Sequence, residues 1–186
     1  MPSIKANGID IHYEDHGDKN APPMLLIMGF GAQLTLWPIE LVDALVERGF
    51  RVIRYDNRDI GLSHKFDGVK APGIIKMTIL NKFGITPKVP YTLADMADDG
   101  AGLLEALGIE QAHIVGASMG GMIAQHVAAK HADKAKSLTS IFSTTGNPKL
   151  PAAKKEAMKV LITRPASMEE DVLVEHGMKL SRTIGS

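Results

Sequence analysis

The sequence contains no cysteine, which excludes disulfide bonds, thiolate metal sites and cysteine nucleophiles together. It also lacks long apolar runs, since the longest, such as residues 24–28, are far too short to span a bilayer. The first eight residues carry no apolar stretch of the kind that a signal peptide needs. We therefore expect a cytoplasmic protein that has no membrane partner and needs no metal or cofactor.

An excess of charge of either sign is missing as well. The 21 basic and 21 acidic side chains cancel, so the chain has no electrostatic footprint for nucleic acid or for an anionic membrane. With 186 residues, 45% of them hydrophobic, the chain is long enough for one domain with a real core. A large second domain is not expected.

Hydrophobic periodicity predicts an α/β fold. Residues 3–6 and 9–13 alternate around Asn7-Gly8, a dipeptide typical of a two-residue hairpin turn. Beyond this hairpin, apolar runs of strand length alternate with amphipathic helices, which predicts a mostly parallel sheet with right-handed crossovers. The strands are expected at 22–28, 50–55, 112–116 and 136–142, and the helices are expected to begin at Pro38, Thr92 and Met119.

The pattern changes after Asn147-Pro148. Residues 152–162 and 168–182 predict two helices with no strand between them. Ser167 and Glu170 have the spacing of a capping box at the second of these helices.

Two loop regions carry weaker signals. Residues 61–90 are rich in Gly, Pro and Lys and fit only a long excursion between elements. Asp56 and Arg58 follow a predicted strand, and we expect them to brace that loop through local hydrogen bonds.

The segment most informative for chemistry is Gly116-Ala117-Ser118-Met119-Gly120, which joins a buried strand directly to a helix. In such a Gly-x-Ser-x-Gly turn the serine hydroxyl stands clear of the sheet as a nucleophile. Side chains at 116 and 120 would collide there, so both positions need glycine. The amide of Met119, at the helix N-terminus, points to where a tetrahedral oxyanion would form. The alternative is a tight turn with an incidental serine, but the strand-to-helix context favours the nucleophile.

A second element, Met28-Gly29-Phe30-Gly31, follows the first central strand. Together with the elbow and the run Tyr55–Ser63, it resembles the α/β-hydrolase superfamily, and more narrowly its methylesterase and cofactor-free haloperoxidase-like branch, over about residues 3–150. The resemblance implies that the backbone amide of Phe30 is the other oxyanion donor, although a plain glycine turn remains an alternative.

The resemblance implies a three-layer, mostly parallel sheet of the α/β-hydrolase type, with an N-terminal hairpin. It places the N-terminal part of the core at residues 1–147 and the start of a helical cap at 148–186. Two positions depart from the common pattern of the superfamily: Met28 stands where histidine is usual, and Asp59 stands where glycine is usual. Neither change removes a backbone amide.

In this family the catalytic acid and histidine follow the serine in the chain. Most residues after Ser118 are predicted to belong to the cap, and none of the seven histidines is predicted to be the base; they lie at positions 12, 16, 64, 113, 126, 131 and 176. We therefore expect the acid, the histidine and the C-terminal part of the core outside this chain. A sheet that stops at its fourth parallel strand leaves an edge, for which we expect a complementary C-terminal fragment or a homo-oligomer.

The expected function is hydrolysis of a small-molecule carboxylic ester through an acyl-enzyme on Ser118, with this chain near-silent on its own. Three alternatives keep the same fold. The first is a perhydrolase or haloperoxidase-like enzyme, the second is a carbon–carbon bond hydrolase, and the third is a protein that binds a ligand without turnover. The chain as one piece of a split enzyme is a further alternative.

Overall fold

The computed structural model describes residues 2–69, 85, 88–147, 149–151, 154–163 and 165–185. The chain divides into two compact units, Met1–Thr145 and Gly146–Ser186, which we call unit 1 and unit 2. Most of the excursion predicted within 61–90 lies outside the described residues.

Unit 1 is built on a mixed sheet, in which the described residues form six strands in the order β1-β2-β4-β3-β5-β6. The pairs β1–β2 and β2–β4 are antiparallel, and all pairs from β4 to β6 are parallel, which confirms the prediction of a mostly parallel sheet with an N-terminal hairpin. The strands are β1 Ser3–Ala6, β2 Ile9–His16, β3 Pro23–Ile27, β4 Arg51–Tyr55, β5 Ala112–Ala117 and β6 Ala135–Ile141. The carboxyl ends of the parallel strands share one edge, where ligands bind in open α/β sheets.

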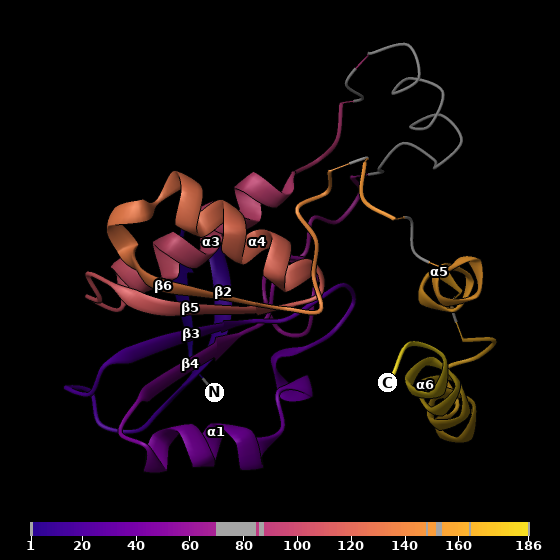
Figure 1. Ribbon diagram of the computed structural model, residues 1–186, viewed down its shortest axis with the longest axis horizontal. Coiled ribbons are helices and arrows are strands. Elements are labelled where there is room, and N and C mark those ends of the chain that lie inside the picture. The colour runs from indigo at the N-terminus through magenta and orange to yellow at the C-terminus, as the bar shows by residue number, and fades with distance from the viewer. Residues whose placement is uncertain are drawn as a thin grey trace. The chain divides into compact units, whose positions relative to one another are not determined.

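Helices cover both faces of this sheet. Helix α1 (Ile39–Glu47) lies on one face, and α3 (Leu93–Ala106) with α4 (Met119–Lys130) lies on the other, as Figure 1 shows. Three layers result, as in the predicted α/β-hydrolase arrangement. A short 3₁₀ helix, η1 (Leu34–Leu36), precedes α1, and another, η2 (Ala132–Lys134), follows α4.

The alternation of side chains along the strands explains how both faces become buried. In β3, Leu25 and Ile27 pack into the core under α3 and α4, whereas Leu26 packs on the other side with Trp37 and Val42. Successive residues of a strand point to opposite faces, so a continuous apolar run supplies two cores at once. This is the physical reason that residues 22–28 read as a strand from sequence.

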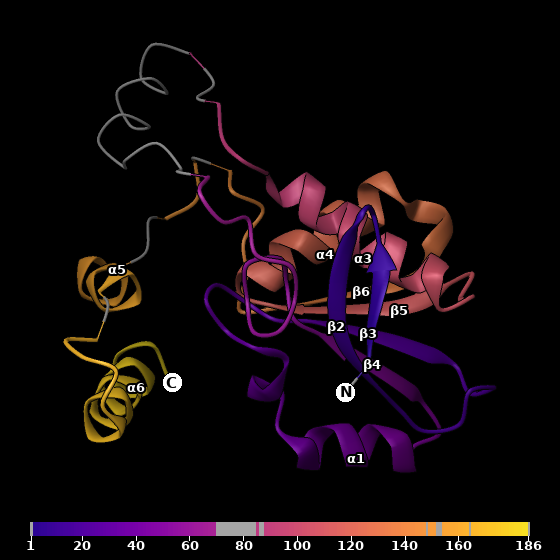
Figure 2. The ribbon, with the colours of Figure 1, turned by 180° about the vertical axis from the view of Figure 1, so that it is seen from behind.

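The hairpin of β1 and β2 lies at one edge of the sheet, where β1 packs against helix α3 (Figure 2). Asn7 and Gly8 both have positive φ, 47° and 81°, as the two-residue turn requires. Gly102 of α3 lies so close that a Cβ there would approach the backbone nitrogen of Asn7 to 3.0 Å. The turn and the helix are therefore packed backbone to backbone.

The capping predictions have opposite outcomes. Thr92 caps α3 and forms a full capping box with Asp95, as predicted for the start of this helix. The predicted capping box of Ser167 and Glu170 is wrong. The hydroxyl of Ser167 accepts a hydrogen bond from the N–H of Glu169 instead, at 3.3 Å, and helix α6 begins only at Glu170.

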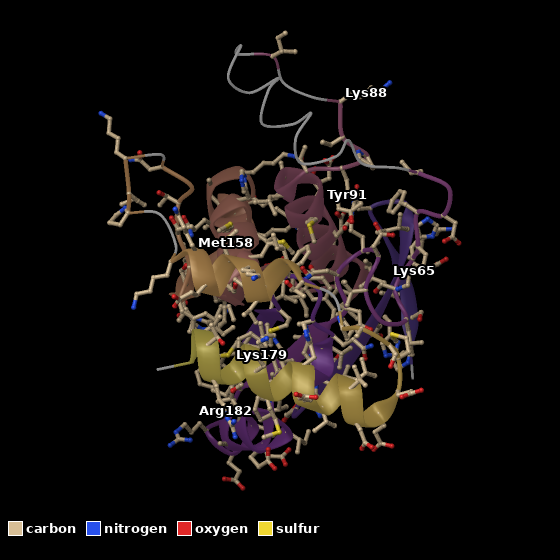
Figure 3. The ribbon with its side chains drawn as sticks, turned by 90° about the vertical axis from the view of Figure 1, so that its right-hand side faces the viewer. Lys65, Lys88, Tyr91, Met158, Lys179 and Arg182 are labelled. Carbon is tan, nitrogen blue, oxygen red and sulfur yellow. The ribbon has the colours of Figure 1, made fainter. Side chains whose placement is uncertain are left out.

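Unit 2 consists of two helices, α5 (Lys155–Ile162) and α6 (Glu170–Ile184), that pack against each other. Figure 3 labels Met158 on α5 and Lys179 and Arg182 on α6. None of the described helices is long and apolar enough to cross a membrane.

Candidate active site

Ser118 lies at a sharp turn between β5 and α4. Its backbone has φ 55° and ψ −122°, a conformation that side-chain-bearing residues rarely adopt and that costs on the order of 1–3 kcal/mol. Two contacts with the end of β6 hold it: the N–H of Ser118 donates to the Ile141 carbonyl at 3.0 Å, and its carbonyl accepts from the Ser143 hydroxyl at 2.7 Å. The predicted elbow conformation is confirmed, and the residue is exposed at the carboxyl edge of the sheet.

The glycines around Ser118 are required by contact. A Cβ on Gly116 would come within 2.1 Å of the Gly120 carbonyl oxygen, and a Cβ on Gly120 would come within 2.1 Å of the Ile27 carbonyl oxygen. A third glycine, Gly121, is also crowded, because a Cβ there would lie 2.5 Å from the Cβ of Ser143. Helix α4 therefore begins directly against β3 and the end of β6.

The loop after β3 passes directly over the serine. A Cβ on Gly29 would lie 3.0 Å from the Cβ of Ser118 and 3.5 Å from its Oγ, so a side chain there would force the loop or Ser118 to shift by a few tenths of an ångström. Phe30 is the next residue. Within the described part of the chain, the backbone N–H groups of Phe30 and Met119 donate no hydrogen bond. Both amides are thus free to donate. Met119 follows Ser118 in the sequence, and Phe30 follows Gly29, which lies against Ser118. The convergence of the two amides on one oxyanion stays a prediction.

Asn57 fixes the start of this loop, and sequence reasoning missed it. Its side-chain Nδ2 donates to the Met28 carbonyl at 2.9 Å, and the side chain is buried. A Cβ on Gly120 would lie 2.7 Å from the same carbonyl oxygen, so Met28 is held between Asn57 and the start of α4. The available signal was position alone: Asn57 is a polar residue just after a buried parallel strand, at the edge that carries the elbow.

Asp56 joins the loops after β3 and β4. Its carboxylate accepts from the N–H of Leu34 at 2.8 Å and from the N–H of Leu62 at 2.9 Å. Gly61, at φ 50°, lies against this carboxylate, where a Cβ would overlap it. The predicted local bracing by Asp56 is therefore accompanied by a contact 22 residues away.

Arg58 departs further from the expectation of local hydrogen bonds. Its guanidinium pairs with the buried carboxylate of Asp99 on α3, and lies over the rings of Phe66 and Tyr91 at 5.3 and 5.1 Å from their centroids. The correct partner is 41 residues away, so local chain geometry carries no sign of it. Figure 3 shows the segments of Lys65 and Tyr91 on the same side of unit 1.

The backbone of Asp59 is left-handed, at φ 65°, a conformation that glycine adopts without steric cost. Aspartate nevertheless occupies this position, at which the superfamily pattern has glycine. The carboxylate accepts from the N–H of Phe66 at 2.7 Å and from the hydroxyl of Tyr91 at 2.6 Å. Burial, together with this bond to Asp59, raises the pKa of Tyr91 to about 12. The two hydrogen bonds of the Asp59 side chain thus offset the steric cost of its left-handed backbone, a cost that glycine would not have.

No histidine or carboxylate of the described residues hydrogen-bonds the hydroxyl of Ser118. Three of the seven histidines form side-chain hydrogen bonds elsewhere: His16 with Glu14, His113 with Ser137 and His131 with Asp98. The described residues also contain no group of three or more side chains that could hold a metal ion. Among the described residues, Ser118 therefore has two free backbone amides nearby and no histidine or carboxylate hydrogen-bonded to its hydroxyl.

The strained serine, the three glycines that only close packing explains, and the free amides beside them form one constellation at the carboxyl edge of the sheet. Over residues 22–179 the sequence matches the model of the alpha/beta hydrolase fold family. The chain belongs to this family.

Relatives of this α/β hydrolase include rhodomycin D methylesterase DauP from a Streptomyces species, which is 28% identical over 93% of the chain. An enol-lactonase from Burkholderia xenovorans has a similar structure, with a TM-score of 0.65 and 26% identity, and the match covers 99% of this chain and 68% of that one. A meta-cleavage product hydrolase from Pseudomonas fluorescens has a TM-score of 0.73 at 21% identity, covering 98% of this chain and 56% of that one, and shows the fold alone.

The α/β hydrolase described here spans only part of such proteins. The match covers 59% of the length of DauP and 59% of the length of its counterpart DnrP from Streptomyces peucetius. The resemblance to the methylesterase branch is thus confirmed over part of the length of these relatives.

Proposed function

We propose that this protein is a serine hydrolase that cleaves a small-molecule carboxylic ester through an acyl-enzyme. The observation that carries the proposal is the backbone of Ser118, held at φ 55° and ψ −122° at the carboxyl edge, with the Gly29-Phe30 loop against it. Two relatives support it by their names: a methylesterase cleaves an open-chain carboxylic ester, and an enol-lactonase cleaves a cyclic one.

In the proposed reaction, the Ser118 oxygen attacks the ester carbonyl carbon and forms a tetrahedral adduct. The backbone amides of Phe30 and Met119 donate to the developing oxyanion, and the positive end of the α4 dipole adds to this stabilisation. The adduct collapses with loss of the alcohol and leaves an acyl group on Ser118. Water then releases the acid through the same oxyanion geometry.

A serine hydroxyl needs a base to accept its proton. Because no described histidine contacts Ser118, we propose that the histidine and its orienting acid come from a segment of the whole protein outside these 186 residues. The partial coverage of the relatives supports this. Residues Lys136–Ser140 of the outermost strand β6 are exposed, and we propose that a further segment of the whole protein pairs there.

The test compares the whole protein with its Ser118→Ala variant, using a fluorophosphonate probe and a p-nitrophenyl ester. Ser181→Ala, on exposed α6, is the matched control. We expect labelling and turnover in the wild type and in the control, and neither in Ser118→Ala. Turnover that survives the loss of Ser118 would overturn the proposal.

The 186-residue chain alone gives a second comparison. Without a base, oxyanion donors alone leave about 10³–10⁴-fold acceleration over water, against a millionfold or more for intact enzymes. We expect slow or absent labelling of this chain. Rapid Ser118-dependent turnover would mean that one of its own histidines is the base. Peroxide in place of water as the acyl acceptor tests the perhydrolase alternative in the same assay.

A further inference from the structure

Four residues other than glycine have a left-handed backbone among those that the structure describes: Asn7, Asp59, Ser118 and Phe142. The structure accounts for three of these backbones. Asn7 occupies a hairpin turn that favours asparagine, Asp59 gains two hydrogen bonds, and Ser118 is the candidate nucleophile. Phe142, at φ 35°, has none of these.

Phe142 also gives the fold no visible packing. Its side chain is 79% exposed, whereas large apolar side chains normally stabilise a protein by burial. A left-handed backbone costs about 1–2 kcal/mol for a residue with a Cβ, and glycine would avoid this cost. Within the described residues, packing thus gives Phe142 no advantage over glycine, and strain of this kind concentrates at functional sites.

The position of Phe142 is next to the elbow. It directly follows Ile141, whose carbonyl accepts the hydrogen bond from the N–H of Ser118. Phe30, which is 69% exposed, directly follows Gly29, which touches Ser118 from the other side. In the sheet, β5 lies between β3 and β6, so one exposed phenylalanine follows each strand that flanks the strand of Ser118.

We propose that Phe142 and Phe30 are the two apolar walls of the substrate site, and that Phe142 selects esters whose acyl group carries an aromatic ring. This inference rests on the proposed function for the reaction at Ser118. Aromatic side chains stack on or pack edge-to-face against flat rings, which gives more contact to an aryl group than to a methyl group. The strain at Phe142 is then retained for the substrate site and not for the stability of the fold.

The test uses Phe142→Gly and Phe142→Leu in the whole protein, with p-nitrophenyl benzoate and p-nitrophenyl acetate as substrates. We expect Phe142→Gly to raise KM for the benzoate by about 10- to 100-fold and to leave KM for the acetate within about twofold. Phe142→Leu, which keeps an apolar wall without a ring, is expected to fall between. The melting temperature of Phe142→Gly is expected to equal or exceed that of the wild type.

Two results would overturn the inference. One is an equal change, or no change, in KM for the two esters. The other is a clear fall in melting temperature in both variants, which would show that Phe142 is a structural residue covered in the whole protein. Binding of benzoate, followed by NMR line broadening, gives a readout without turnover. We expect binding in wild type and Ser118→Ala but not in Phe142→Gly. Absent turnover with Phe142-dependent binding would therefore contradict only the proposed function.

Discussion

Arg58 donates two hydrogen bonds to Asp99, from Nε to Oδ2 and from Nη2 to Oδ1, each 2.6 Å long. Asn7 of the hairpin turn donates to the same carboxylate, from Nδ2 to Oδ1 at 2.9 Å. One buried carboxylate thus connects the hairpin, the loop after β4 and helix α3. The bidentate geometry gives this connection orientation as well as attraction.

Removing the charge of Asp99 is predicted to destabilise unit 1 strongly. Asp99→Asn leaves the buried guanidinium of Arg58 without its counter-charge, for which we expect a loss of about 3–5 kcal/mol in the free energy of unfolding. Urea denaturation measures this. Glu105→Gln, on the exposed side of the same helix, is the control and should change stability by less than about 0.5 kcal/mol. Equal effects of the two substitutions would contradict the assignment.

Two substitutions at Asp59 separate its backbone from its side chain. Asp59→Ala keeps the left-handed strain and loses both hydrogen bonds, so we expect a loss of about 1–3 kcal/mol in stability. Asp59→Gly loses the same bonds but relieves the strain, and should be more stable than the alanine variant by about 1 kcal/mol. Thermal or urea unfolding of both variants provides the comparison. An alanine variant more stable than the glycine variant would show that the left-handed backbone at position 59 does not destabilise the protein.

Asn57 is predicted to act on rate rather than on binding. Without its Nδ2, the Met28 carbonyl keeps only its packing against the start of α4, so the Gly29–Phe30 peptide that follows is held less firmly and the Phe30 amide moves out of position. In the whole protein we expect Asn57→Ala to lower kcat by about 10- to 100-fold, less than the roughly 10²–10³-fold cost of removing an oxyanion donor itself, with little change in KM. Asn57→Asp, which repels the carbonyl, should be no better. An exposed asparagine, Asn20, supplies the control Asn20→Ala.

Acid is predicted to destabilise the protein partly through Asp15. Burial alone would raise its pKa, but hydrogen bonds from Arg51 and Lys19 lower the pKa below the ordinary value of 3.8. A lowered folded-state pKa adds stability that is complete above the unfolded pKa and is lost as pH falls through the folded one. Asp15→Asn should therefore be less stable than wild type at pH 7, and the difference should shrink below about pH 4. Asp43→Asn, on an exposed face of α1, is the control and should change stability at pH 7 by less than about 0.5 kcal/mol.

The elbow and the sheet could be predicted because their causes are local. Gly116 and Gly120 bracket Ser118 at the spacing of a tight strand-to-helix turn, and short apolar runs such as residues 22–28 between turn signals are typical of central strands. The pairing of Arg58 with Asp99 could not be predicted, because it depends on where α3 crosses the sheet.

Spacing was also insufficient where a competing local bond exists. Ser167 has the correct distance from Glu170 for a capping box, yet its hydroxyl accepts from Glu169, two residues ahead, before the helix begins. The contact of Asn57 with Met28 left no mark in the pattern either, since a polar residue after a strand has many uses. Loops at the carboxyl edge are thus where sequence alone says least about the site.

The crowding around Gly116, Gly120 and Gly121 has a consequence for mutational scanning. Any side chain at these positions meets backbone or a neighbouring serine within 2.1–2.5 Å, so substitutions should reduce the amount of folded protein in the cell. Ser118 is different, because a variant such as Ser118→Gly relieves strain and should accumulate normally while losing activity. A library scored once for abundance and once for activity would therefore place the three glycines and the serine in separate classes, although all four would look equally intolerant in a growth selection.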